Sequence, residues 1–373
     1  MAELKAVPKD LLKSGAFLDD CDPDDLVYFL LNVGDGDAQV LLLPEDSPGK
    51  RQAVVVDVAK SSKTLDLFKT LAAGEKPLLP DRPDLIPLVV ASHPHEDHIA
   101  GIPKLLKEKA PEEIWEPGYY YPGAGFFSMM QAIEAAKIRH LQPTSGLVRF
   151  IGPVKITVLS PGISLRNRFD SYGIDTNNSS IALKVEYPMN RYVERNGDRS
   201  AVKLPRPVRL LLGADAQTLS WAQVQIDFPQ LEANGSAVAE ALQKANGVDP
   251  LKADLFKIAH HGSKHGISLE LIELAKPSLS LVSSDLAGSR YGFPHLVALE
   301  QIREALEATT TSGKKHSDDW ELGLHYTCGV DTAKAELGSI AVVLSKTGRK
   351  KSIWRFGDSP SQSLDLSGAR RFA

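Results

Sequence analysis

A short apolar stretch followed at once by a cluster of histidines constrains this sequence more than any other feature. Residues 88–91 are wholly apolar, which is typical of a strand buried on both faces of a sheet. The segment His93-Pro94-His95-Glu96-Asp97-His98 follows directly and holds three of the chain's 10 histidines. Because a rigid sheet fixes the direction of side chains at its edge, this position suits a chemical site.

The donor types in this cluster favour a metal site. In an extended stretch His93, His95 and Asp97 point the same way, and a turn before the helix expected over 99–108 brings His98 to the same centre. Imidazole and carboxylate donors suit Zn²⁺, Mn²⁺ or Fe. The alternative is a polar turn in which Asp97 only caps the helix. Three histidines with an aspartate favour the metal over the cap.

The rest of the pattern predicts strands in runs at both ends of the chain, with helices between them. The β-rich runs 26–33 and 38–43 flank Gly34-Asp35-Gly36-Asp37, which is typical of a hairpin turn. Such runs favour an α/β protein with two packed sheets and outer helices over a doubly wound parallel sheet. Further strands are expected at 53–58, 113–115, 147–151, 154–159, 181–187, 208–213, 255–259, 279–282, 339–345 and 351–356, and further helices at 61–73, 126–140, 219–246, 269–275 and 296–308.

Composition limits the class of protein. The 373 residues are 43% apolar and 24% charged, which excludes a disordered chain. No apolar run approaches the roughly 20 residues that cross a bilayer, and the N-terminus has no apolar signal core, so we expect a cytoplasmic protein without a membrane partner. The 2 cysteines lie far apart, which excludes a disulfide framework. The net charge of −4 excludes a strongly basic nucleic-acid binder but allows a local basic groove.

Domain organisation follows from the even composition. No shift in composition marks a boundary, so we expect a single domain over 1–373. Within it, 1–23 is expected to be an N-terminal arm and 309–335 a loop insertion. The sequence indicates nothing about the oligomeric state.

The cluster HPHEDH resembles the HxHxDH signature of the metallo-β-lactamase superfamily. That resemblance implies a four-layer αββα sandwich of two mixed β-sheets flanked by helices. It also implies two divalent metal ions, Zn²⁺ first and Mn²⁺ as the alternative, bridged by an aspartate after a later strand; Asp215, after the run 208–213, fits that position. A last metal histidine is expected after 255–259, where His260 and His261 stand, and His261 is slightly favoured.

Further motifs resemble one branch of that superfamily, the catalytic domain of bacterial DNA-uptake (competence) channel proteins and its free-standing soluble relatives. They lie in family order at 28–38, 177–183, 260–264 (HHGSK) and 290–295 (RYGFPH). Phe293 departs from the branch, which has a histidine there. The superfamily's middle metal histidine has no clear counterpart, and the branch places an asparagine at that point, here Asn178.

The resemblance implies a role for each site residue. A hydroxide shared by the two metals would attack the substrate, and Asp97 would orient it. The developing charge would be stabilised by a donor such as His260, His295 or Lys264. Asp57 or Glu96 would hold a ligand histidine in one tautomer. The implied metal ligands are His93, His95 and Asp215 for the first metal, and Asp97, His98, Asp215 and His261 for the second.

Three hypotheses for function follow. The first is a metal-dependent phosphodiesterase or nuclease, with nucleic acid as a substrate only by resemblance. The second is a small-molecule hydrolase on the same site, acting on a phosphorylcholine ester, a cyclic nucleotide or a lactone. The third is a non-catalytic binding module with a degraded metal site, which Phe293 and the missing histidine motivate. Residues that could serve a nucleic acid are Lys252, Lys257, Lys264 and Arg290 as cations, and Trp115 with Tyr119, Tyr120 and Tyr121 as stacking or merely packed rings.

Overall fold

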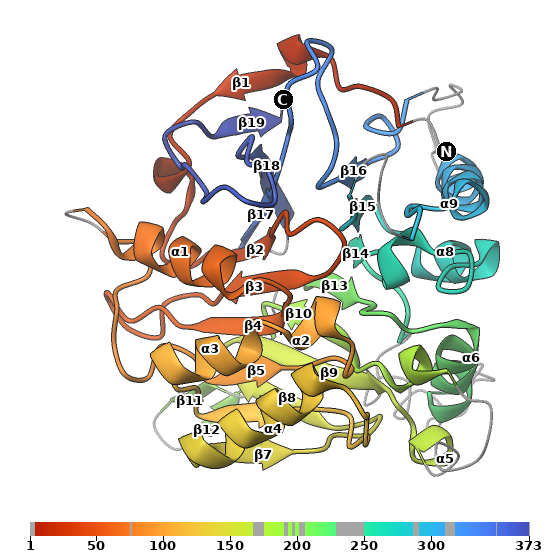
Figure 1. Ribbon diagram of the computed structural model, residues 1–373. Helices are drawn as coiled ribbons and strands as arrows, with labels where there is room; N and C mark the ends of the chain where they lie inside the picture. The colour runs from red at the N-terminus through yellow and green to blue at the C-terminus, as the bar shows by residue number, and fades with distance from the viewer. Residues whose placement is uncertain are drawn as a thin grey trace.

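Two β-sheets pack face to face in the computed structural model, with helices on both outer faces (Figure 1). The structure describes residues 4–74, 77–166, 175–189, 193–195, 198–200, 206–228, 250–285, 291–309, 318–347 and 349–372. Both large sheets mix parallel and antiparallel pairs, as in β4–β5 against β2–β3 and β13–β14 against β10–β13. The predicted α/β sandwich of two mixed sheets is confirmed.

The first sheet has ten strands and is built around the predicted hairpin. Its order is β1 (Leu12–Ser14), β19 (Arg370–Phe372), β18 (Arg349–Arg355), β17 (Ile340–Ser345), β2 (Leu26–Leu30), β3 (Ala38–Leu42), β4 (Ala53–Val58), β5 (Leu88–Val90), β6 (Glu113–Trp115) and β7 (Arg139–Leu141).

The second sheet has seven strands and carries most of the remaining predicted ones. Its order is β16 (Leu324–Tyr326), β15 (Leu279–Val282), β14 (Leu255–Lys257), β13 (Val208–Leu212), β10 (Ala182–Tyr187), β9 (Val154–Ser160) and β8 (Val148–Ile151). A separate two-stranded ribbon is formed by β11 (Val193–Arg195) and β12 (Asp198–Ser200).

The helices divide between the two outer faces (Figure 1). Those of the first sheet are α1 (Ser61–Ala72), α2 (Glu96–Ile99), α3 (Ile102–Glu108) and α4 (Ala124–Ala136). Those of the second are α5 (Ile163–Arg166), α6 (Thr218–Asp227), α8 (Leu269–Ala275) and α9 (Leu296–Thr309), and 3₁₀ turns lie at Lys9–Leu11, Leu18–Asp20, Thr176–Ser179 and Ala259–Gly262.

Alternation along the strands explains the layers. Val54 and Val56 of β4 face the second sheet in the core between the sheets, while Val55 packs under the outer helices. In the second sheet Leu211 and Phe256 pack outward against α6 and α8. Because nearly every position of these strands is buried on one face or the other, they appear in the sequence as mostly apolar runs.

The helix predicted over 99–108 is divided into α2 and α3. At the break, the Gly101 N–H donates to the Val58 carbonyl at 2.7 Å, and a Cβ there would lie 2.5 Å from the Ser61 nitrogen. Only glycine allows this approach of the chain to β4. Asp97 lies in the helical turn of α2 and not in the extended stretch that the sequence suggested, whereas His98 lies in a turn as expected.

Other expected boundaries also differ from the structure. The arm 1–23 contributes β1, which pairs with β19 at the sheet edge. The expected loop insertion 309–335 contains β16, an edge strand that pairs with β15; three residues are too few to give a periodic signal. The helix expected over 126–140 ends at Ala136, so His140 belongs to β7. Of the helix expected over 219–246, α6 covers the beginning and residues 229–249 lie outside the described residues.

No helix among the described residues is both long and apolar enough to cross a bilayer. The cytoplasmic location stays a prediction.

His325 of β16 supplies a test of packing at this edge. Burial, and then the charges of Arg355 and Lys350, lower the pKa of His325 from 6.5 to about 3. The unfolded chain therefore binds a proton between these pH values that the folded chain does not, so stability falls on acidification by about 1.4 kcal/mol per pH unit.

We predict that His325→Leu reduces this loss of stability on acidification. Urea unfolding of the wild type and the variant at pH 7, 6, 5 and 4 measures it. Equal pH slopes for the two proteins would show that His325 is protonated in the folded state.

Candidate metal centre

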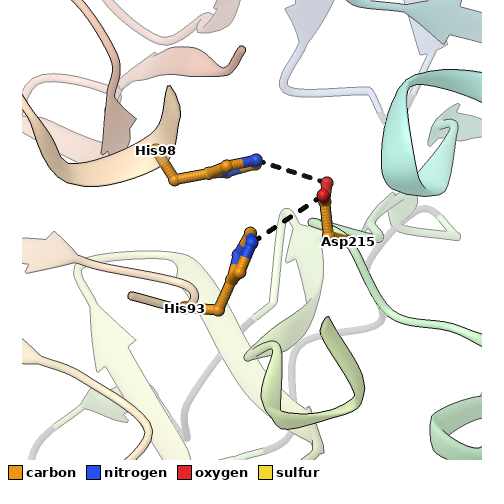
Figure 2. Close-up of side chains that lie close together, drawn as sticks. All are labelled: His93, His98 and Asp215. Atoms are coloured by element: carbon orange, nitrogen blue, oxygen red, sulfur yellow. Dashed lines mark ion pairs between the residues drawn. The ribbon is translucent and has the colours of Figure 1, made fainter. Parts of the chain in front are cut away.

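Three chain segments that follow buried strands meet at one edge of the sandwich. His93–His98 follows β5 of the first sheet, whereas Asp215 follows β13 and His260-His261 follows β14 of the second. The Asp215 carboxylate lies among the imidazoles of the other two segments, and Figure 2 shows it facing His93 and His98. The juxtaposition that the sequence predicted is therefore present in the structure.

The two oxygens of Asp215 face two different sets of nitrogens. Oδ1 lies 3.3 Å from His98 Nε2 and 3.5 Å from His261 Nε2. Oδ2 lies 3.7 Å from His93 Nε2 and 3.6 Å from His260 Nε2. A carboxylate shared in this way is the arrangement that a bridging ligand requires.

The set around Oδ1 approaches the dimensions of a tetrahedral metal site. Asp97 Oδ2 completes it at 3.8 Å from both His98 Nε2 and His261 Nε2. Ligands at about 2.0–2.1 Å from Zn²⁺ lie about 3.3–3.4 Å from one another in a tetrahedron. His98 Nε2, His261 Nε2 and Asp215 Oδ1 are also buried without a hydrogen-bond partner. Buried polar atoms are rarely left in that state, so these residues fit a bound cation.

The set around Oδ2 is more open. His93 Nε2 lies 3.1 Å from His95 Nδ1 and 3.7 Å from Asp215 Oδ2. His93 and Asp215 form, with His98, a group of donors that could hold a metal ion, and His95 adjoins this group through its contact with His93. His93 is fully buried while His95 borders the cavity above the site.

Hydrogen bonds behind the ligands fix which nitrogen of each ring faces the site. The Asp57 carboxylate accepts from His98 Nδ1 at 2.8 Å and from the Ser92 hydroxyl at 2.7 Å. These hydrogen bonds agree with the predicted role of Asp57, which is to hold a ligand histidine in one tautomer. Glu96, the other candidate, lines the cavity instead.

The same logic holds for two more rings. Ser92 Oγ donates to Asp57, so it accepts from His93 Nδ1 at 3.1 Å. His261 Nδ1 donates to the Ser283 carbonyl at 3.0 Å. In each case the Nε2 lone pair is left facing the site.

Charges within the site shift the pKa values in opposite directions. Burial alone would lower the pKa of His98, but the charges of Asp215 and Asp57 outweigh it and raise that pKa well above its usual value. Burial would raise the pKa of Asp215, yet neighbouring imidazoles, His98 first, lower it well below. Burial, and then the charge on His98, keep the pKa of His93 well below its usual value. A bound divalent cation would therefore displace a proton from His98, while His93 is already neutral.

Strained backbone aims several of these side chains. Non-glycine residues with positive φ include Asp57 (57°), Ala214 (44°), His260 (49°) and His261 (53°). Such conformations cost of order 1–2 kcal/mol each and persist only where the surroundings impose them. Their concentration at this edge is typical of a functional site.

The structure separates the remaining predicted residues from the metal donors. The side chain of Asn178 bonds Gln217 and Ser220 at the start of α6, so it is not a middle metal ligand. His295 Nδ1 accepts from the Val297 N–H at the start of α9. Lys264 is exposed, and neither it nor His295 lines the cavity. Lys257 is fully buried in an ion pair with Asp37 and cannot form part of a groove.

A cavity of about 550 Å³ lies over the donors. Aromatic side chains stand on two sides of it: the Tyr121 ring lies 5.4 Å from His95, and Phe293 lies 5.3 Å from His260. Trp115 is buried, so it is not a stacking surface here. The cavity is lined by Asp35, His95, Glu96, Asp97, Tyr121, Asn177, Asp215, His260, His261, Tyr291 and Phe293.

Several residues that shape the site carried no motif signal. Ser92 and Ser283 act through hydrogen bonds to ligand rings, and Gln217 contacts His260. Serine and glutamine are common, and nothing in their spacing marks a bond to a residue far away in the chain. Only coordinates could find them.

Comparison with known proteins supports the fold. Residues 49–193 match the family model described as the metallo-beta-lactamase superfamily. The matched range contains the His93–His98 segment and ends before Asp215. This part of the chain is therefore similar to that superfamily, and the two mixed sheets with flanking helices have the metallo-beta-lactamase fold.

Solved structures give distant likenesses only. Similar chains include YhfI from Bacillus subtilis, a metallo-beta-lactamase fold protein (12% identity, 80% of this chain, 95% of that one, TM-score 0.39). Another is CmlA from Streptomyces venezuelae, a diiron beta-hydroxylase (9% identity, 81% of this chain, 52% of that one, TM-score 0.40), so this chain spans about half of CmlA. Human tRNase Z, short form, is a third (14% identity, 69% of this chain, 92% of that one, TM-score 0.34).

A comparison with curated proteins finds no match. The narrower resemblance to the competence-channel branch stays a prediction.

The bridging position of Asp215 gives a direct test. We predict that Asp215→Ala lowers bound metal from about two ions per chain toward zero, because both donor sets lose a ligand. Mass spectrometry of metals in the purified folded protein measures this, with circular dichroism as the check on folding. Asp66→Ala on α1 is the control and should keep its metal. Full metal content in Asp215→Ala would contradict the bridge.

Proposed function

We propose that this protein is a metal-dependent phosphodiesterase. The observation that carries the proposal is the pair of donor sets on the two oxygens of Asp215, directly under a cavity of about 550 Å³. Two bound divalent ions would lower the pKa of a bound water to about 7 and would neutralise charge on a phosphoryl group.

The chain's own residues position these parts. Asp215 fixes the separation of the two donor sets, and Asp57 holds His98 with Nε2 toward the site. Asp97 keeps 29% of its side chain exposed and lines the cavity, so it can accept a hydrogen bond from an attacking water while it completes the second set. His93, His98 and His261 are buried, so bulk water does not reach these imidazoles from the protein interior.

The lining of the cavity favours a small or single-stranded substrate. Tyr121, Tyr291 and Phe293 offer ring faces or edges against which a base or another planar group can pack. Among the described residues that line the cavity there is no lysine or arginine, so a long duplex held by its phosphates is not favoured. Arg290, a predicted cation, lies outside the described residues.

A small-molecule ester or lactone hydrolase is the second candidate. The same lack of lining cations favours it, because a neutral ester needs no cation beyond the metals. The third hypothesis, a binding module with a degraded site, is disfavoured by the buried donors gathered around the two oxygens of Asp215. It would apply if the protein held metal and cleaved none of the substrates below.

A substrate panel on the metal-loaded protein tests the proposal. We expect kcat/KM for bis-p-nitrophenyl phosphate, a cyclic nucleotide and single-stranded oligonucleotides to exceed that for duplex DNA and for a lactone by at least about tenfold, which is about 1.4 kcal/mol of discrimination. Asp215→Ala is the inactive control. Turnover of the lactone alone would support the second candidate and contradict the phosphodiesterase.

A further inference from the structure

His260 differs from the neighbouring metal-donor histidines in what its Nδ1 contacts. Nδ1 of His93, His98 and His261 faces a hydrogen-bond acceptor, respectively the Ser92 hydroxyl, the Asp57 carboxylate and the Ser283 carbonyl. Nδ1 of His260 lies 3.4 Å from the side-chain nitrogen of Gln217. An amide nitrogen can only donate, so His260 alone is contacted at Nδ1 by a donor.

The orientation of the Gln217 amide is fixed by its other partners. Its Nε2 donates to the Asp175 carboxylate at 3.1 Å, and its Oε1 accepts from Asn178 Nδ2 at 3.3 Å. Asn178 is itself held, since its Oδ1 accepts from the Ser220 N–H and hydroxyl. Turning the Gln217 amide over would place its oxygen against a carboxylate and its nitrogen against a donor. The nitrogen therefore faces His260.

This arrangement decides the tautomer of His260. With Nδ1 as acceptor, the ring proton sits on Nε2, the atom 3.6 Å from Asp215 Oδ2. A protonated Nε2 has no lone pair for a metal. We propose that Gln217 is a positioning residue that keeps His260 out of the first metal's ligand set and presents it to the substrate as a hydrogen-bond donor.

The cavity gives this donor a place to act. His260 lines it, with 13% of the side chain exposed and Phe293 beside it. On the proposed phosphodiesterase function, its Nε2–H donates to a phosphoryl oxygen on which charge grows, and the proton stays on nitrogen throughout. Removing one such preorganised donor typically costs about 10²–10³ in kcat.

Reversing the direction of the hydrogen bonds that connect Asp175, Gln217 and His260 tests the proposal. The double variant Gln217→Glu with Asp175→Asn places an acceptor at His260 Nδ1 and gives the new carboxylate a donor on its other side. We expect His260 to change from the Nε2–H to the Nδ1–H tautomer in two-bond ¹H–¹⁵N spectra of histidine-labelled protein, assigned with His260→Gln. Asp227→Asn at the end of α6 is the control, because it makes the same substitution away from His260 and should leave the Nε2–H form.

Kinetics and metal affinity then separate a positioning role from a structural one. We expect the double variant to lose about 10²-fold in kcat on a phosphodiester with little change in KM. The affinity of the double variant for the first metal should rise, because Nε2 of His260 gains a lone pair. Gln217→Met, which removes the donor without adding charge, should show a mixture of tautomers.

Two results would overturn the proposal. One is an Nδ1–H signal for His260 in the wild type, and the other is an unchanged kcat in a double variant whose tautomer has switched. The spectra need no turnover, so a protein inactive on every phosphodiester would contradict the proposed function while the tautomer was still measured.

Discussion

The structure depends on bringing one buried carboxylate between two sets of imidazoles. Asp215 is 2% exposed, and the atoms around its Oδ1 have no hydrogen-bond partner. Burying such groups unpaired is unfavourable, and a cation shared by them removes that cost. In the absence of a metal, the raised pKa of His98 and the lowered pKa of Asp215 show the same preference for a positive charge between them. The positive φ angles of Ala214 and of His261 show that backbone conformation is strained to achieve this arrangement.

The sandwich holds these donors in place because they come from both sheets. His93–His98 follows a strand of the first sheet, and Asp215 and His261 follow strands of the second. Beneath the site the sheets are joined by the buried ion pair of Asp37 and Lys257 and by a 2.6 Å bond from the Ser283 hydroxyl to the Gly36 carbonyl. The packing between the sheets therefore sets the geometry of the metal centre.

Much of the fold and the donor set could be predicted from the sequence. Apolar runs such as β4 and β15 give a strong signal, and HPHEDH combines unusual donor types in a few residues. Asp215 and the histidine doublet could be predicted because the resemblance to the metallo-β-lactamase superfamily implies ligands after later strands, and each of them follows such a run.

The rest depends on contacts between distant residues. Nothing in the sequence near Lys257 indicates that it pairs with Asp37, or that Asn178 would hold α6 and not a metal. The edge strand β16 and the break at Gly101 depend on neighbouring elements that local patterns do not describe. The contact between Gln217 and His260 could not be predicted either, because the orientation of the Gln217 amide depends on its hydrogen bonds to Asp175 and Asn178.

The most direct test of this account is a crystal structure of the metal-loaded protein with anomalous scattering measured at the metal edge. The account predicts two peaks about 3.5–4 Å apart, each about 2.0–2.2 Å from one oxygen of Asp215. One peak would lie by His93 and His95 and the other by Asp97, His98 and His261. Metal bound elsewhere, or an Asp215 carboxylate in contact with neither ion, would contradict it.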